Sequence, residues 1–539
     1  MTPPADSPLS SPSPSPPVSE RAQIARSAGI LALGSIASRV LGLVREVVIA
    51  DLFGASGLVS AFRIAAQVPT MVYELIVGGL FSAALVPVFS QVAEQKGRAA
   101  LWALFSRVAS LIAILLSAIV LLLELLAPQV AWLMGGGFTP ELQAVLVRMI
   151  RIVSPAVLLF GLSGVVTGLL YALKRFTFPA FGAAVFNLGT VIAALLLADR
   201  IGAYSLAVGV LVGSVLQLLI QTPDLRGVKI SFRLDLRHDP AVRRILALYL
   251  PIAAGLLVSQ LQIVIDRRLA SSTGASSLAW MANATTLIQL AHGLVAVAIS
   301  QAVLPTLSRQ SAAGDMDGFR STLGQGLRLV LVLIVPATLA LLALAQPIIS
   351  LLFEHGRFTA YDTYWTTWAL RLYLLGLVFA SIDWPLNFAF YARQNTLTPA
   401  LVGMFSVGVY LVVALSLVGS LGMRGLVLAD SAKHISHAVT MLILASRTIG
   451  GLGALGLSRT FMKTLLAGGV MAALMAAVVV WIGPLLNDGD LLGKLAIVTI
   501  AAGLGGMAYL FLANALGVGE VRLVRDLLSR GTGGRRQAD

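Results

Sequence analysis

Residues 110–126 read SLIAILLSAIVLLLELL and contain a single charged side chain, Glu124. A helix of this composition enters the roughly 30 Å hydrocarbon core of a bilayer. The rest of the chain is similar, since 58% of its 539 residues are hydrophobic and only 12% are charged. An average soluble domain has about twice that charged fraction, and the mean hydropathy here is +0.91. The sequence therefore predicts an all-α integral membrane protein.

Composition also excludes several classes of function. The chain has no cysteine, which excludes disulfides, thiolate catalysis and cysteine-ligated metal centres. Its net charge of +14 lies mostly in loops between apolar segments, so we expect contact with membrane lipids and no nucleic-acid partner. Residues 1–20 are rich in proline and serine and are predicted to be a disordered cytoplasmic tail, not a signal peptide.

Apolar runs and their breakers predict about fourteen transmembrane helices. Their approximate centres are residues 37, 75, 115, 159, 186, 211, 256, 290, 334, 377, 407, 436, 469 and 503. We expect an N-terminal six-helix lobe over 21–240 and a C-terminal six-helix lobe over 241–450. Two additional helices would occupy 451–518, before a basic cytoplasmic tail at 519–539.

Short motifs recur about 220 residues apart and indicate a duplication. The matched pieces are 171–172 with 391–392 (YA), 179–180 with 399–400 (PA), 136–139 with 356–359 (GxFT), Arg151 with Arg371, and Pro87 with Pro305. Chance matches between apolar segments are the alternative. Since each copy has an even number of spans, the two repeats would be parallel, forming two lobes around a central cavity as in several transporters.

Basic residues predict the orientation of the helices. Lysine and arginine are concentrated in alternate loops, for example 96–98, 174–175 and 226–244, while 127–140 has none. Loops rich in these residues stay in the cytoplasm, so both termini are expected there.

Ionisable side chains inside spans are costly unless they meet a partner or a wet cavity. The first span contains Arg39, Arg45 and Glu46, and the second contains Arg63 and Glu74. For Arg39 we favour a cavity role, in which the guanidinium binds an anionic phosphate bidentately. Arg45 and Glu46 have the alternative of reaching to the interface. For Glu74 the two alternative ion-pair partners are Arg39 and Arg63.

Two further groups of charges lie in later spans. Arg267 and Arg268 end the seventh span, on the side of the membrane whose loops are otherwise poor in basic residues. They either contact a ligand or anchor the helix at the interface. Asp430, Lys433, His434 and His437 share one helix at spacings of three and four. They form either an ion or proton relay or a self-neutralised polar stripe. No third ligand joins the histidines, so no metal site is predicted, and no enzymatic motif is present.

Residues 38–46, SRVLGLVRE, resemble the S-R-x-L-G-x-x-R-D signature of the MurJ/MviN-type lipid II flippases. Other matching pieces are 53–55 (FGA), 172–176, 179–181, 213–223, 280–281 (WM), 356–360 and 391–399. The resemblance covers roughly residues 27–520. It implies a fourteen-helix member of the multidrug/oligosaccharidyl-lipid/polysaccharide exporter superfamily in the bacterial cytoplasmic membrane. Arg39 and Arg45 would then line the substrate cavity, helped by Arg63, Arg267 or Arg268.

The resemblance implies a flippase for lipid II that works by alternating access, without covalent chemistry or a cofactor. The substrate would be a polyprenyl-pyrophosphate-linked glycan, with coupling to the membrane potential or a monovalent cation and cell-wall synthesis proteins as partners. Neutral residues replace family charges at Ser60, Tyr73, Gly78, Thr285, Thr286 and Gln289. Export of another lipid-linked glycan, ion-coupled drug antiport and a transport-inactive scaffold are therefore the alternatives.

Overall fold

The computed structural model describes residues 18–78, 85–228, 240–450, 452–486 and 490–520. Throughout these ranges the regular structure is helical and no strand is present. This confirms the predicted all-α class. The expected tail at 1–20 lies largely outside the described residues, and the first helix begins at Val18. Most of the predicted basic tail, from residue 521 onward, is outside them as well.

The described residues form a series of helices. In chain order they are α1 (Val18–Phe53), α2 (Gly57–Tyr73), η1 (Glu74–Gly78), α3 (Val86–Gly135), α4 (Pro140–Val153), α5 (Ala156–Ala172), α6 (Thr177–Ala180), α7 (Gly182–Ile201), α8 (Tyr204–Leu219), η3 (Thr222–Leu225), α9 (Pro240–Ser272), α10 (Ser277–His292), η4 (Gly293–Val297), α11 (Ala298–Ala312), α12 (Met316–Ala343), α13 (Ala345–Phe353), α14 (Ala360–Ala392), α15 (Leu397–Leu421), α16 (Met423–Thr448), η5 (Leu452–Leu455), α17 (Leu457–Ile482), η6 (Gly483–Leu486) and α18 (Leu491–Ala515).

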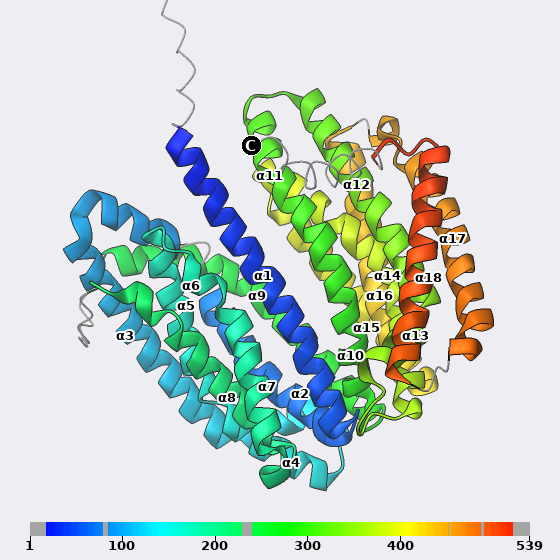
Figure 1. Cartoon of the computed structure of the whole chain (residues 1–539). Coiled ribbons are helices and arrows are strands. Elements are labelled where there is room, and N and C mark those ends of the chain that lie inside the picture. The colour runs from blue at the N-terminus through cyan, green and yellow to red at the C-terminus, as the bar shows by residue number, and fades with distance from the viewer. Residues whose placement is uncertain (1–17, 79–84, 229–239, 451, 487–489, 521–539) are drawn as a thin grey trace, which may run out of the picture.

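Helices α3 to α8 gather in one group and α10 to α18 in another (Figure 1). We call these the N-lobe and the C-lobe. Helices α1 and α9 join the two lobes. Helix α1 contacts α2, α6 and α7 on one side and α10 and α13 on the other, while α9 contacts α3 in the N-lobe and α15 and α16 in the C-lobe. Both helices therefore lie at the boundary between the lobes.

Several helices bend where the sequence supplies a cause. Helix α3 turns at Gly97, whose φ of 77° is rare for residues with a side chain. Helices α2 and α10 each continue into a single π-turn, η1 and η4. Such turns release backbone groups from the regular ladder and are frequent at functional sites.

Large apolar side chains cover the outside of the helical bundle. Examples are Leu125, 75% exposed, and Trp481, 75% exposed. In water such a surface would aggregate, whereas lipid chains solvate it. Ten of the described helices or helix pairs are long and apolar enough to cross a membrane. The predicted multi-pass membrane class is confirmed, and the count of fourteen crossings stays a prediction.

Candidate functional site: an arginine-lined cavity between the lobes

A cavity of about 200 Å³ lies between α1 of one side and α10 of the other. Its lining residues are Ser38, Arg39, Gly42, Leu43, Arg45, Glu46, Thr286, Gln289 and Leu290. Ser38 and Arg39 also border a neighbouring cavity of about 340 Å³, which extends along α1 to Tyr171 and Ala180. The predicted residues Arg39 and Arg45 thus face the same space between the lobes.

Arg39 reaches across this space to the C-lobe. Its Nη1 donates to the backbone oxygen of Gln289 at 2.9 Å. The guanidinium lies against Gly293, the first residue of η4, where a Cβ would collide with it. A guanidinium has five N–H donors, and one of them is used here. Arg39 therefore contacts the opposite lobe and still has donors for a ligand.

Glu46 balances part of the positive charge. Its side chain is 3% exposed, and its Oε1 accepts hydrogen bonds from Nη2 of Arg45 at 2.7 Å and Nη1 of Arg63 at 2.9 Å. A second hydrogen bond joins Arg63 Nη2 to Oε2 of Glu46. A buried carboxylate needs such partners. With Arg39 included, the group of three guanidiniums and one carboxylate has a net charge of +2.

Asn187 of α7 orients Arg45. Its Oδ1 accepts from Nη1 of Arg45 at 3.0 Å, and its Nδ2 donates to the backbone oxygen of Ser38 at 3.1 Å. Arg45 also borders a cavity of about 190 Å³ inside the N-lobe, which contains Arg63 and Gln67. Arg45 therefore lies between Arg63 and the space that Arg39 faces. Arg63 influences that space through its ion pair with Glu46 and through its positive charge.

The neutral positions noted in the sequence have identifiable contacts. Thr286 and Gln289 line the cavity opposite the arginines. The hydroxyls of Thr285 and Thr286 both donate to the backbone oxygen of Ala282 at 3.0 Å. Ser60 accepts the Ala279 N–H at 3.3 Å and so connects α2 to α10. Tyr73 packs with Phe160 inside the N-lobe.

The remaining position, Gly78, leaves room for the Glu74 carboxylate, which a Cβ there would meet at 2.5 Å. Glu74 was expected to choose between Arg39 and Arg63. Among the described residues neither arginine pairs with it, because Arg63 binds Glu46 and Arg39 binds the Gln289 carbonyl.

The charged residues of α16 form a cluster inside the C-lobe. Lys433 Nζ lies 2.5 Å from Asp430 Oδ1, and His434 Nε2 lies 3.6 Å from Asp430 Oδ2. His437 Nδ1 contacts Asp383 Oδ1 of α14 at 2.7 Å. Each carboxylate here therefore has a basic partner within hydrogen-bond or ion-pair range.

Arg267 is part of this C-lobe cluster. It lies 3.4 Å from Asp266, whose Oδ1 accepts from the Tyr410 hydroxyl at 2.5 Å. Arg267 also interacts electrostatically with Asp430, and Lys433 lies 5.9 Å from the Tyr410 ring. None of these contacts includes Arg39 or Arg45. Arg267, predicted as a substrate-binding residue, therefore lies with the predicted relay residues of α16.

Arg268 has a different position, at the end of the molecule where α1 and α9 terminate. Its Nη1 donates to the Trp132 carbonyl at 2.5 Å, and its guanidinium lies 4.9 Å from the centre of the Trp132 ring. Nearby, the Gly137 N–H donates to Ser271 Oγ at 3.0 Å. These contacts join the end of α3 to the end of α9, and we call them the α3–α9 latch.

A second latch joins the end of α1 to the connection between α13 and α14. The Arg357 N–H donates to the Asp51 carbonyl at 2.9 Å, and His355 Nδ1 lies 3.0 Å from Asp51 Oδ1. Gly356 has a φ of 57°, and a Cβ there would meet the Asp51 oxygens at 2.3 Å.

The residues of the two latches correspond in sequence. Gly137 and Arg357 are 220 positions apart, as are Ser271 and Asp51. Positions that are 220 residues apart in the sequence thus make corresponding contacts in the two latches.

Comparison with known proteins identifies the family. The sequence model described as "Lipid II flippase MurJ" matches residues 49–498. The chain belongs to the MurJ family. A lipid II flippase MurJ of Burkholderia cenocepacia is 31% identical over 392 residues, covering 71% of this chain and 75% of that protein. A probable lipid II flippase MurJ of Haemophilus influenzae is 29% identical, covering 69% and 76%.

Solved structures agree with the MurJ assignment. A lipid II flippase MurJ in an inward closed conformation matches with a TM-score of 0.76 and 25% identity, over 92% of this chain and 99% of that one. An inward-facing MATE transporter of the MOP superfamily has a TM-score of 0.66 at 13% identity, over 77% and 96%. At that identity the MATE likeness concerns the fold alone.

Sequence reasoning found the MurJ-type arginines and missed their partners. Glu46 was noted as a substituted acid, yet its bond to Arg63, 17 positions away, was not expected. No sequence pattern predicted the role of Asn187 or the Asp51–His355 contact. A polar side chain in an apolar span is the one signal that would have pointed to Asn187.

Proposed function

We propose that this protein flips lipid II from the inner to the outer leaflet of the bacterial cytoplasmic membrane by alternating access. The observation that carries the proposal is the cavity between the lobes, in which Arg39 and Arg45 face α10 in a chain of the MurJ family. Members of this family are transporters, so the protein is not an enzyme. Its role belongs to peptidoglycan synthesis.

The pyrophosphate of the lipid-linked precursor would bind at Arg39 first. Arg39 has N–H donors left over after its bond to Gln289, whereas Arg45 is already held by Glu46 and Asn187. Two guanidiniums on a pyrophosphate form charge-assisted bonds, the strongest class of hydrogen bond in proteins. The net positive charge of the group favours a polyprenyl-pyrophosphate-linked glycan over neutral lipids. Arg267 and Arg268 would position the lobes and not touch this substrate.

The two latches provide a physical basis for alternating access. In this proposal both close the same end of the cavity. Each depends on a few hydrogen bonds, from the end of α3 to α9 and from the α13–α14 connection to α1. Breaking them and forming contacts at the opposite end would expose the cavity to the other side. We propose fourteen crossings, as two parallel six-helix repeats with two further helices, and both termini in the cytoplasm. The element order and the 220-residue offset support this arrangement.

The C-lobe cluster is our candidate for coupling to the membrane potential or a monovalent cation. Asp430, held by Lys433, and Asp383, held by His437, are ion pairs that a proton or cation can replace. Cell-wall synthesis proteins as partners remain an expectation.

The test is transport of lipid II by the purified protein in proteoliposomes. We expect lipid II to become accessible in the opposite leaflet faster than in protein-free vesicles. The neutral Thr286 and Gln289 beside the arginines favour a second candidate, export of another lipid-linked glycan. Binding of such a glycan in native mass spectrometry, without binding of lipid II, would replace the first proposal by the second.

A further inference from the structure

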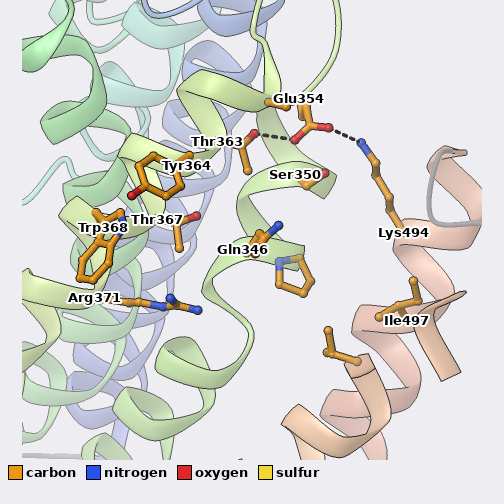
Figure 2. A pocket seen from close by; sticks show the side chains of 14 residues that line it. Gln346, Ser350, Glu354, Thr363, Tyr364, Thr367, Trp368, Arg371, Lys494 and Ile497 are labelled. Atoms are coloured by element: carbon orange, nitrogen blue, oxygen red, sulfur yellow. Dashed lines mark hydrogen bonds and ion pairs between the residues drawn. The ribbon is translucent and has the colours of Figure 1, made fainter. Parts of the chain in front are cut away.

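A second polar cavity lies at the edge of the C-lobe, away from the arginine cluster. It has a volume of about 660 Å³ and is enclosed by α13, α14, the end of α17 and the start of α18. Figure 2 shows Arg371 and Thr367 of α14 pointing toward Gln346 of α13, with Lys494 of α18 across from them. No residue proposed above to bind lipid II lines this cavity.

Polar residues repeat along both walls of the cavity. On the α13 side they are Gln346, Ser350 and Glu354, and on α14 they are Thr363, Thr367 and Arg371. Each set has a spacing of four, so each lies along one face of its helix. Helices within a bilayer normally present apolar side chains to each other or to lipid. Two polar stripes that face one cavity therefore indicate a space occupied by a polar group.

Some of these groups already have partners. The Thr363 hydroxyl donates to Glu354 Oε2 at 2.6 Å, and Lys494 Nζ lies 3.4 Å from Glu354 Oε1. These two contacts join α14, the end of α13 and α18 at one end of the cavity, as the dashed lines in Figure 2 show. The single carboxylate of the cavity is thereby neutralised by Lys494.

Deeper in the cavity, two donors have no acceptor. Within the described ranges the Arg371 guanidinium makes no hydrogen bond or ion pair. The Thr367 side chain is 5% exposed, and its buried hydroxyl also has no hydrogen-bond partner. A cation and an unsatisfied hydroxyl on the same helix face favour an anionic acceptor, because leaving such groups unpaired in a membrane protein is costly.

Arg371 lies well inside α14, and aromatic residues line the cavity between it and the start of the helix. It is the twelfth residue of α14, so it lies about 16 Å along the helix from its first residue. Tyr364 and Trp368 line the same cavity, and such residues are enriched where bilayer meets water. Beside the cavity, Leu485 is 81% exposed and Leu492 is 78% exposed, so lipid chains surround this part of the molecule.

We propose that this cavity binds the phosphate of an anionic phospholipid, taken laterally from the leaflet that faces the α13–α14 connection. Arg371 would bind the phosphate as a charge-assisted donor and Thr367 would donate its free hydroxyl, while Lys494 cancels the negative charge of Glu354 at the mouth. The proposal is independent of lipid II transport, because it shares no residue with the arginine cluster.

The experiment uses the full-length protein in nanodiscs that contain a diazirine derivative of phosphatidylglycerol. After photolysis, labelled peptides from α13 and α14 are quantified. Arg371→Gln is the test variant, and Arg371→Lys retains the charge. Arg151→Gln is the matched control, since Arg151 is the equivalent position of the other repeat and its Nε contacts the Glu124 carbonyl. Thr367→Val is a second test, should Arg371→Gln unfold at lower temperature.

We expect Arg371→Gln to reduce labelling of α13 and α14 about tenfold, as loss of a charge-assisted hydrogen bond predicts. Thr367→Val should reduce it about threefold, and Arg151→Gln and Arg39→Ala should leave it unchanged. The corresponding phosphatidylcholine probe should label weakly. Labelling of Arg371→Gln and Thr367→Val equal to the unmodified protein would overturn the proposal. Complete competition by glycerol 3-phosphate would overturn the lipid source and identify a soluble phosphate ester as the ligand.

Discussion

Arg39 and Arg45 both face the cavity, yet their side chains differ in the hydrogen bonds that they already make. Arg45 makes hydrogen bonds to Glu46 and Asn187 within its own lobe. Arg39 has one bond, to a backbone oxygen of the opposite lobe. Arg39 therefore combines two properties that transport requires, namely free donors for an anion and a contact that changes when the lobes move.

Arg39→Ala should abolish transport of lipid II while the protein still inserts and accumulates. The lost charge-assisted bonds contribute about 1.5–3 kcal/mol each, and among the described residues Arg39 donates one hydrogen bond, to a backbone oxygen. Arg39→Lys should restore activity partly, because it retains the charge and loses the planar fork. The measurement is lipid II flipping in proteoliposomes, with the exposed Arg26 of the same helix as the control position. Normal flipping by Arg39→Ala would remove this site from the proposed mechanism.

Glu46→Gln should have opposite effects on stability and anion binding. Removing one partner of a buried ion pair costs about 3–5 kcal/mol, so thermal unfolding in detergent should occur at lower temperature. The net charge of the cluster would rise by one, so binding of an anionic ligand should strengthen. Adding Arg63→Gln should recover part of the stability, since it removes the unpaired guanidinium. Weaker anion binding together with an unchanged melting temperature would show that Glu46 does not set the charge of the cavity.

The residue-level analysis also shows what sequence can and cannot predict. Arg39 was identifiable because a charge in the middle of an apolar helix needs a reason. The Glu46–Arg63 pair was not, because both residues are near helix ends and several arginines were equally available. Arg267 and Arg268 are adjacent in sequence but belong to different contacts, with Asp266 and Trp132. Helical rotation and tertiary packing decide such cases, and neither is visible in a motif.

Helix α10 contains Thr285, Thr286 and Gln289, three of the neutral positions where the family resemblance implies charges. It presents Thr286 and Gln289 to the arginine cavity. Thr285→Asp with Thr286→Arg should tighten binding of lipid II, because Thr286 already faces the cavity. The native form should show the stronger dependence on salt, since exposed single charges are readily screened. The measurement is binding of both forms at two ionic strengths. Equal affinities and salt slopes would show that α10 does not contribute to specificity.

At the level of elements, the helical class was predictable and the local geometry was not. Composition and apolar runs predict membrane helices, and the structure has them. The single span expected around residue 75 is instead α2 followed by the π-turn η1. A one-residue change in hydrogen-bond register leaves no periodic signal in the sequence. It depends on packing, here of Tyr73 and Val77 against Gly164 of α5.

For the whole molecule, the basic-loop pattern predicts which ends of the helices are cytoplasmic. Single cysteines can test this directly because the native chain has none. We expect Ala99→Cys and Ala313→Cys to be protected from an impermeant maleimide in intact cells, and Glu141→Cys and Arg357→Cys to be labelled. These positions are exposed, whereas Gly136 and Gly356 lack room for a side chain. Labelling at Ala313 with none at Arg357 would reverse the orientation.

The latch between Asp51 and His355 allows a test of the transport cycle. Asp51 and His355 lie on opposite sides of the boundary between α1 and the C-lobe, 3.0 Å apart. Asp51→Cys with His355→Cys, joined by a short bis-methanethiosulfonate linker, should hold this end closed. Alternating access then requires that flipping fall to the rate of protein-free vesicles, because the cavity can no longer open on that side.

Reduction of the linker should restore transport, and each single cysteine treated with the same reagent should remain active. Lipid II binding should persist in the cross-linked form, because the latch is separate from Arg39 and the other end of the cavity is not restrained. This separates a blocked conformational change from a damaged site. Transport by the cross-linked protein at the rate of the reduced form would mean that the substrate crosses without separation of this latch, and the alternating-access proposal would fail with it.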